Sequence, residues 1–122
     1  MDEKFFQNIF DTIQDFLPDN LCRIAFYAGY TEGSYTMKFY VDSGCGYDDC
    51  FNICSDSELI KLFKSVDKIL SAERKKLDGK YMWTVFSMFI SSSGDFNTKF
   101  DYVDISENFI DYENHWKEIY LK

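Results

Sequence analysis

Two neighbouring stretches in which apolar side chains occupy every second position constrain this fold more than any other feature of the sequence. In residues 22–30 the alternating positions run from Cys22 to Tyr30, and residues 35–41 repeat the pattern from Tyr35 to Val41. Thr-Glu-Gly-Ser separates the two stretches and is typical of a hairpin turn. Because successive side chains of a strand point to opposite faces, the pattern predicts an antiparallel hairpin with one buried face. The other face is expected to be tyrosine-rich and partly wet.

Three further segments show the three- and four-residue spacing of amphipathic helices. The first is expected over residues 3–17 with Asp2 as its cap. The second is expected to begin at Ser55 or Asp56, either of which can cap it, with Glu58 placed for a capping box. The third is expected over roughly 107–120. Their apolar faces are, in order, Phe5, Phe6, Ile9, Phe10, Ile13 and Phe16; Leu59, Leu62, Phe63, Val66, Ile69 and Leu70; and Phe109, Tyr112, Trp116 and Ile119.

Residues 81–90 are apolar on both alternating faces, which predicts a central strand covered on both sides. One face is expected to carry Trp83, Val85 and Phe89, and the other Met82, Phe86, Met88 and Ile90. Residues 91–95 predict a turn and residues 96–102 a returning strand. Residues 42–50 show no pattern and are expected to form a loop, and a short third strand is expected from Cys50 to Cys54.

These elements predict one α+β domain that spans residues 1–122, because a chain of 122 residues is long enough for a single hydrophobic core. The expected order is α-β-β-(β)-α-β-β-α, with an antiparallel sheet of four to five strands and N-terminal, central and C-terminal helices.

The net charge of −8, from 21 acidic and 13 basic side chains, argues against direct binding of nucleic acid or of anionic membranes. A basic protein would instead be attracted, although solubility alone also explains an acidic surface. The start Met-Asp-Glu-Lys lacks the pattern of a secretory signal, and no apolar run approaches the ~20 residues of a membrane span. We therefore expect a cytoplasmic protein.

The cysteines invite two interpretations. Cys45, Cys50 and Cys54, together with nearby aspartates and the single His115, have residue types that bind metals. Structural zinc sites, however, show two tight Cys pairs, and here the spacings are irregular and a fourth ligand must come from afar. Disulfides are disfavoured in a reducing cytosol. We expect free thiols, with Cys22 and Cys54 in the core, and no cofactor or metal.

Catalytic motifs are missing from the sequence. A cysteine with His115 and Asn114 would supply the residue types of a thiol nucleophile, but adjacent side chains on a helix point in different directions. No Gly-x-x-x-x-Gly-Lys or Gly-x-Gly-x-x-Gly loop is present. We expect His115 on a partly exposed helix face and a protein that is not an enzyme.

The acidic residues are concentrated in two stretches. Residues 39–60 and 100–116 contain no Lys or Arg, and both interleave carboxylates with aromatic side chains. Such stretches suit a surface that docks onto a cationic cleft, where carboxylates steer encounter and tyrosines supply buried contact area. The alternative is two solvated segments that lie apart.

The last third of the chain combines a tryptophan-led strand, a glycine hairpin, a Phe-Asp-Tyr return strand and a terminal Trp-x-x-x-Tyr-Leu. This block resembles the YezG-like family, whose members are small bacterial immunity proteins (antitoxins) that neutralise nuclease toxins by binding them. The matching positions are Trp83, Gly94, Phe96, Phe100, Asp101, Tyr102, Trp116, Tyr120 and Leu121.

The resemblance implies a partner, namely the C-terminal domain of a cognate, basic nuclease toxin, blocked at its active site or at a neighbouring exosite. Delivery of that toxin by contact-dependent inhibition or by type VII secretion remains open. We expect the toxin contact at Asp48, Asp49, Asp104, Asp111 and Tyr112. The family-block residues Trp83, Phe100, Tyr102 and Trp116 are expected to be structural.

The chain departs from the family pattern at Met82, where a proline is common, and in the segment 44–54, which is a candidate specificity element. A second hypothesis is a small adaptor that binds a protein or peptide through the tyrosine-rich sheet face or an exposed strand edge. A third is a small cysteine enzyme.

Overall fold

A computed structural model describes residues 3–15, 23–31, 34–42, 44, 46–52, 54–77, 82–91, 93 and 95–121. The elements are α1 (Glu3–Gln14), β1 (Arg23–Thr31), β2 (Ser34–Asp42), β3 (Tyr47–Asp49), a 3-10 helix (Cys50–Asn52), α2 (Asp56–Arg74), β4 (Val85–Ile90), β5 (Phe96–Asp101) and α3 (Phe109–Tyr120). This arrangement confirms the predicted α+β class. Within the described residues, no helix combines the length and apolar composition that a membrane span requires.

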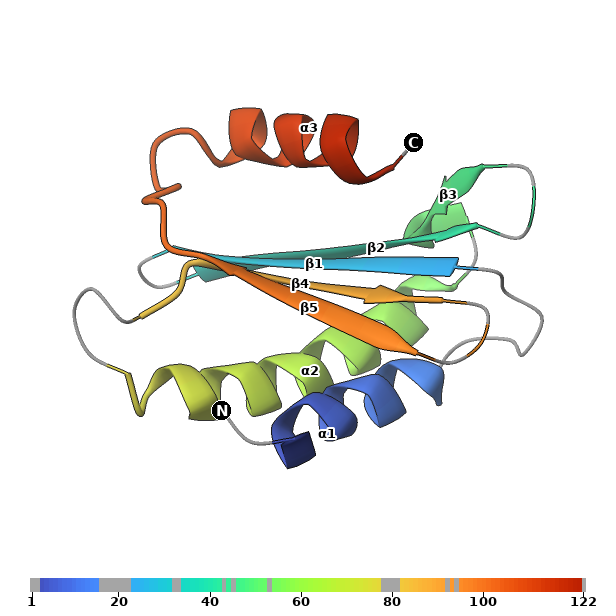
Figure 1. The fold of residues 1–122 in the computed structure, drawn as a ribbon, viewed down its shortest axis with the longest axis horizontal. Helices are drawn as coiled ribbons and strands as arrows, with labels where there is room; N and C mark the ends of the chain where they lie inside the picture. Colours follow the sequence, from blue (N-terminus) through green and yellow to red (C-terminus); the bar gives the residue numbers. More distant parts are fainter. Residues whose placement is uncertain are drawn as a thin grey trace.

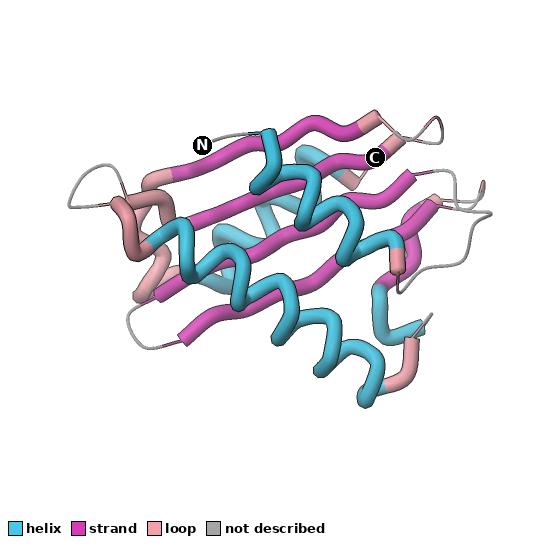
Figure 2. The backbone as a smooth tube through the Cα atoms, turned by 90° about the horizontal axis from the view of Figure 1, so that it is seen from below, coloured by secondary structure: helices cyan, strands magenta, loops and turns pink. Residues whose placement is uncertain are grey.

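The five strands form one antiparallel sheet in the order β3-β2-β1-β4-β5, so β1 lies at its centre. The predicted hairpin is confirmed, with Phe26 of β1 opposite Phe39 of β2 and Met88 of β4. Helices α1 and α2 cover one face, and α3 covers the other (Figure 1). Figure 2, seen from the α1 and α2 side, shows these two helices lying across the strands.

The layer between the sheet and α1 and α2, which we call the main core, contains most of the buried apolar side chains. Ile9 and Ile13 of α1, and Leu62 and Leu70 of α2, are fully buried there. The predicted apolar faces of both helices are therefore confirmed, and Phe16 lies outside the described residues. The capping box at the start of α2 is also present, because Ser55 Oγ accepts from the Glu58 backbone N–H while the Glu58 carboxylate accepts from the Ser55 backbone.

The layer between the sheet and α3, which we call the α3 core, differs from the sequence expectation. The tyrosine-rich face of β1 and β2 was expected to be partly wet, but Tyr27 and Tyr40 are buried beneath α3. Trp116 packs against both rings, with centroid distances of 5.2 and 6.1 Å. The face is buried because α3 returns from β5 across the sheet, a long-range placement that strand alternation does not encode.

The segment after β2 also corrects the prediction. Residues 47–49, expected to lie in a loop, form β3, and the third strand expected from Cys50 to Cys54 is replaced by the 3-10 helix. The cause is a tight reversal directly after β2. Asp42 Oδ1 accepts hydrogen bonds from the backbone N–H of Gly44 and Gly46, whose φ angles of 119° and 105° suit glycine. This reversal lets β3 pair with the end of β2 earlier than expected.

Trp83 lies on the other side of the sheet from the one predicted. It was assigned to the face of Val85 and Phe89, but it packs in the main core against Phe86 and Phe100. The strand was expected from residue 81, whereas β4 begins at Val85. Because Trp83 precedes the regular strand, its side chain does not follow the alternation of β4.

Candidate functional site

Residues 102–111, which connect β5 to α3 and form its first turn, expose apolar side chains that a folded protein usually buries. We call this segment the β5–α3 surface. Its exposed apolar residues are Tyr102 at 55%, Val103 at 51%, Phe109 at 43% and Ile110 at 59%. Contiguous exposed apolar residues with polar neighbours often mark an interaction site. Tyr102, expected to be structural, and Phe109, expected to pack onto the sheet, are therefore both exposed in part.

The β5–α3 surface is exposed but held in place. Asp101 ends β5, and its Oδ1 accepts from the backbone N–H of Tyr102 at 2.8 Å and of Val103 at 3.4 Å. Thr84 Oγ1 donates to the Val103 carbonyl at 2.6 Å. Ile105, only 2% exposed, is buried in the α3 core. The segment is therefore a positioned surface anchored at both its strand end and its middle.

The carboxylates of the β5–α3 surface differ in their local bonds. Asp104 Oδ1 accepts from the Ser106 backbone N–H at 3.0 Å and from the Ser106 hydroxyl at 2.7 Å. These hydrogen bonds lower the pKa of Asp104, because they favour its charged form. Glu107 and Asp111 are exposed, and among the described residues neither makes a side-chain hydrogen bond or ion pair. Both charges are therefore available to a partner.

Tyr112, the fifth predicted contact residue, is turned towards the sheet. Its hydroxyl donates to Asp101 Oδ2 at 2.6 Å, and its ring lies 6.3 Å from that of Tyr27. Burial, and secondarily the hydrogen bond to Asp101, raise the pKa of the Tyr112 hydroxyl. Tyr112 thus fixes α3 to the end of β5, and only its half-buried ring remains for contact with a partner.

Asp48 and Asp49 lie on the short edge strand β3. Asp48 is exposed, while Asp49 is partly covered and its Oδ1 accepts from the Phe51 backbone N–H at 3.0 Å. In Figure 1, β3 is at the right end of the sheet and the β5–α3 connection is at the left end, and Figure 2 shows the same separation. The structure therefore groups Asp104 with Asp111 but does not bring them next to Asp48 and Asp49.

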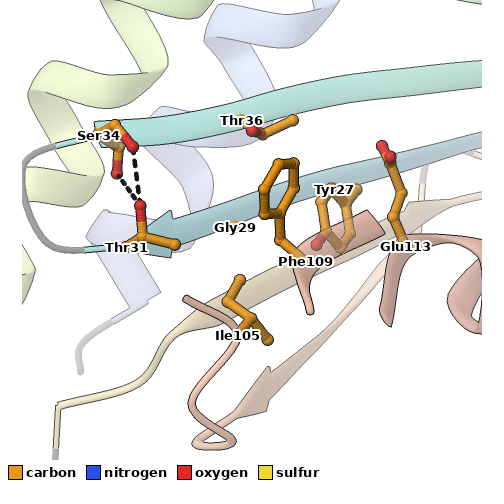
Figure 3. Close-up of a pocket in the computed structure, with 8 residues that line it drawn as sticks. All are labelled: Tyr27, Gly29, Thr31, Ser34, Thr36, Ile105, Phe109 and Glu113. Carbon is orange, nitrogen blue, oxygen red and sulfur yellow. Dashed lines mark hydrogen bonds between the residues drawn. The ribbon is translucent and has the colours of Figure 1, made fainter. Parts of the chain in front are cut away.

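A small cavity of about 50 Å³ opens beside the first turns of α3. Phe109 and Glu113, four residues apart and so on one face of the helix, reach from α3 toward β1 and β2 (Figure 3). The sheet contributes one wall, and the β5–α3 surface together with Glu113 contributes the other. The lining residues are Tyr27, Gly29, Thr31, Ser34 and Thr36 from the sheet, and Ile105, Phe109 and Glu113 from the α3 side.

Gly29 is required where the strand passes this cavity. A Cβ atom at position 29 would lie 2.8 Å from the Tyr27 hydroxyl oxygen and 3.1 Å from Ile105 Cδ1. Neither atom is free to move far, because Tyr27 and Ile105 are both buried in the α3 core. Because Gly29 has no side chain, the strand can pass this close to Tyr27 and Ile105 where it lines the cavity.

Glu113 is the charged residue of this cavity and was not among the predicted contacts. The residue is only 9% exposed, and its Oε1 is buried without a hydrogen-bond partner. Lys38 Nζ lies 3.4 Å from the same oxygen and forms an ion pair with it. Burial, together with the Glu113 charge, raises the pKa values of the Tyr27 and Tyr40 hydroxyls. The carboxylate thus sits in an environment that is short of donors.

A comparison with models of protein families identifies the family of this chain. The family model described as "Immunity protein YezG-like" matches residues 3–122. The chain belongs to this family. The match extends far beyond the terminal block that first suggested it, and it confirms the resemblance. No curated protein sequence matches the chain.

Membership makes this chain an immunity protein, and an immunity protein acts by binding a cognate toxin.

Two residues that the sequence offered for cysteine catalysis lie in places that do not favour it. Cys50 is fully buried, and burial raises the pKa of its thiol to about 11, which disfavours the nucleophilic thiolate. His115 lies on the exposed side of α3, as predicted, 3.9 Å from a Glu118 oxygen.

Among the described residues, no group of three or more metal-ligating side chains is close enough to hold an ion. Cys54 is buried, as predicted, whereas Cys22 and Cys45 lie outside the described residues. The segment proposed for specificity contributes an exposed Asp48 and Phe51 to the surface of the immunity protein, and its Cys50 and Cys54 are buried.

Sequence reasoning missed the exposed Val103 and Ile110, and the buried Glu113. Val103 follows a strand that was expected to end at Tyr102, and it gave no periodic pattern to interpret. Ile110 was outside the predicted apolar face of its helix, and that asymmetry was an available indication of exposure. Glu113 was counted in an acidic stretch, but sequence gave no indication that its carboxylate is covered by the sheet.

Proposed function

We propose that this immunity protein neutralises a cognate nuclease toxin in the cytoplasm by binding it with the β5–α3 surface. The observation that carries the proposal is the combination on one positioned segment of four exposed apolar side chains and the carboxylates of Asp104, Glu107 and Asp111. Interfaces bury aromatic and aliphatic anchors at their centre and place polar groups at their rim. A nuclease must carry cations for phosphate, and these charges complement the surface.

Inhibition would follow from occlusion. Carboxylates that occupy or border the cleft exclude the phosphates of the nucleic acid, and attachment at a neighbouring exosite would block the substrate sterically. Protection demands very little free toxin, so we expect nanomolar affinity, about −12 kcal/mol. An interface of standard size, ~1,600 Å² in total, is sufficient for that affinity when its anchors are well buried.

Asp48 and Asp49 on β3 are proposed as a second contact, separate from the β5–α3 surface. Their position at the other end of the sheet means that a toxin reaching both regions must span the length of α3 (Figure 1). In Tyr112 the hydroxyl is already bonded to Asp101, so its proposed contribution is to hold the surface in place and to offer part of its ring.

The first test is a binding and activity experiment. The tagged protein is mixed with the C-terminal toxin domain encoded beside its gene, and both complex formation and nuclease activity are measured. A tight complex without nuclease activity is the expected result. A toxin that stays free and active would refute the proposal and favour the adaptor hypothesis.

The second test maps the contact by charge reversal. Glu107→Lys with Asp111→Lys should slow toxin association about tenfold at low salt, because exposed charges act mainly on the encounter rate. Charge reversal of Asp104 is a less specific test, because its carboxylate also accepts a hydrogen bond from the Ser106 backbone and stabilises that turn. The matched control is Asp11→Lys with Asp15→Lys, which makes the same charge change at two exposed positions, one in α1 and one directly after it, across the sheet.

Equal slowing by both double variants would mean that only net charge matters and that the β5–α3 surface is not the contact. Asp48→Lys with Asp49→Lys tests the second region in the same assay. An unchanged association rate and affinity would remove β3 from the interface.

A further inference from the structure

The cavity beside α3 has a size that restricts its occupant. Its volume of about 50 Å³ is far below the roughly 300–1,000 Å³ of pockets that hold small molecules and cofactors. It has room for a few water molecules, or for the end of one long side chain. A nucleotide, a sugar or a peptide segment does not fit. The cavity thus suits a single side chain inserted by a bound protein.

The walls of the cavity define the chemistry of that side chain. Ile105 and Phe109 provide apolar surface, and hydroxyl groups of Thr31, Ser34 and Thr36 provide oxygen atoms. Glu113 is the only charged group among the eight residues that line it. An occupant with an apolar stem and a cationic, hydrogen-bond-donating end matches these walls, and Lys and Arg have this form.

The missing hydrogen bond at Glu113 gives a free-energy reason for a cation to bind in the cavity. Its buried Oε1 lacks a hydrogen bond, and Lys38 Nζ at 3.4 Å balances its charge without donating one. A buried, charged acceptor without a donor is unfavourable, and a donor that reaches it gains the strength of a charge-assisted bond. A cation inserted into the cavity would therefore gain a charge-assisted hydrogen bond that Glu113 does not make in the free protein.

We propose that the cavity between α3 and the β1–β2 hairpin receives one Lys or Arg side chain of the toxin, whose cationic end bonds to Glu113. This inference rests on the proposed function and specifies its central contact. Phe109 belongs both to the β5–α3 surface and to the cavity wall, so the inserted side chain would lie within the interface and be shielded from water. Such a fully desolvated contact is typical of a binding hot spot.

Two substitutions of the Lys38–Glu113 pair distinguish this role from a structural one. Glu113→Gln keeps the shape of the side chain but removes its charge, and it should weaken toxin binding about 10- to 100-fold, mainly through faster dissociation. Lys38→Met breaks the same ion pair yet leaves Glu113 unbalanced and available. It should therefore bind the toxin at least as tightly as the wild type does. Binding kinetics of both variants to a catalytically inactive toxin domain measure this contrast.

A structural role predicts a different pattern, in which both variants lose affinity equally because both lose the same pair. That result would overturn the inference, as would Glu113→Gln binding within twofold of the wild type. Circular dichroism and thermal unfolding of each variant establish that α3 is still docked.

A scan of the toxin identifies the inserted residue. Each Lys and Arg of the toxin domain is replaced by Ala and tested against wild-type protein and against Glu113→Gln. One toxin cation should lose its effect in the Glu113→Gln background, because the two changes remove the same contact. If the wild-type pair binds but no cation couples to Glu113, the cavity inference is wrong while the proposed function stands. If the wild-type protein does not bind the toxin, the cavity inference and the proposed function are both wrong.

Discussion

The sheet is covered on one face by α1 and α2 and on the other by α3, and the layers beneath these helices differ in chemistry. The main core is built mainly from aliphatic side chains and phenylalanine, with Trp83 fully buried among them. The α3 core has fewer buried side chains and is rich in tyrosine, and polar contacts hold it in place. Trp116 Nε1 donates to Ser87 Oγ at 3.0 Å, and Tyr112 donates to Asp101.

We propose that this difference separates stability from recognition. The main core buries the larger apolar area, so it should supply most of the free energy of folding. The α3 core positions a helix whose other side and first turn carry the exposed apolar and acidic groups. Elements that bind partners are often drawn from the less stable parts of a fold.

Trp83→Ala should destabilise the protein by about 3–5 kcal/mol, the range expected for a large aromatic side chain removed from a packed core. Its ring is fully buried and lies 5.3 Å from Phe100 and 5.6 Å from Tyr30. Urea denaturation measures the change in the free energy of unfolding. Tyr102→Ala is the matched control from the same family block and should change stability by no more than about 0.5 kcal/mol, because its ring is exposed.

Trp116→Ala should cost less, at most about 3 kcal/mol, although Trp116 is as large and is only 3% exposed. The reason is that Trp116 packs in the α3 core, separate from the main core, so α3 can undock while the main core stays folded. Native-state hydrogen exchange should show the amides of α3 exchanging faster and those of β1 and α2 unchanged. A loss equal to that of Trp83→Ala, with β1 exchanging faster too, would show that both layers unfold as one unit.

Tyr112→Phe should have the smallest effect, about 1 kcal/mol at pH 7, from the lost hydrogen bond to Asp101. The pKa of Tyr112 is raised in the folded protein, so below pH 10 both states keep the proton and the contribution is complete. Above pH 10 the unfolded state ionises first, and the wild type loses stability as the pH rises towards the folded pKa. Urea titrations at pH 7, 9, 10 and 11 measure the difference in the free energy of unfolding between wild type and variant. This difference should decrease only above pH 10.

A difference that stays constant to pH 11 would mean that the Tyr112 hydroxyl ionises alike in both states and does not pin α3. Tyr30→Phe is the matched control from the main core. Tyr30 also donates to a carboxylate, Asp67 Oδ1 at 2.7 Å, and its pKa is likewise raised. A similar decrease in its difference from the wild type is expected, but without any change in hydrogen exchange at α3.

Local patterns in the sequence determined the type and faces of most elements. Alternation in residues 22–41 predicted the β1–β2 hairpin and which of its side chains share a face, because strand periodicity is a property of the backbone. Helical spacing predicted the buried faces of α1 and α2. Ser55 or Asp56, together with Glu58, predicted the start of α2, and Ser55 is the cap. The terminal block indicated the family. The sequence also placed Asp104 and Asp111 together, since only seven positions separate them.

Tertiary structure alone decided which layers those faces meet. No local pattern states that α3 crosses back over Tyr27 and Tyr40, that Trp83 joins the main core, or that β3 pairs with the end of β2. Each of these depends on contacts between segments distant in sequence, whose free energy is set by the shape of the assembled neighbours. The same holds for Glu113. Its charge is written in the sequence, but its burial beside a small cavity exists only once the helix has docked on the sheet.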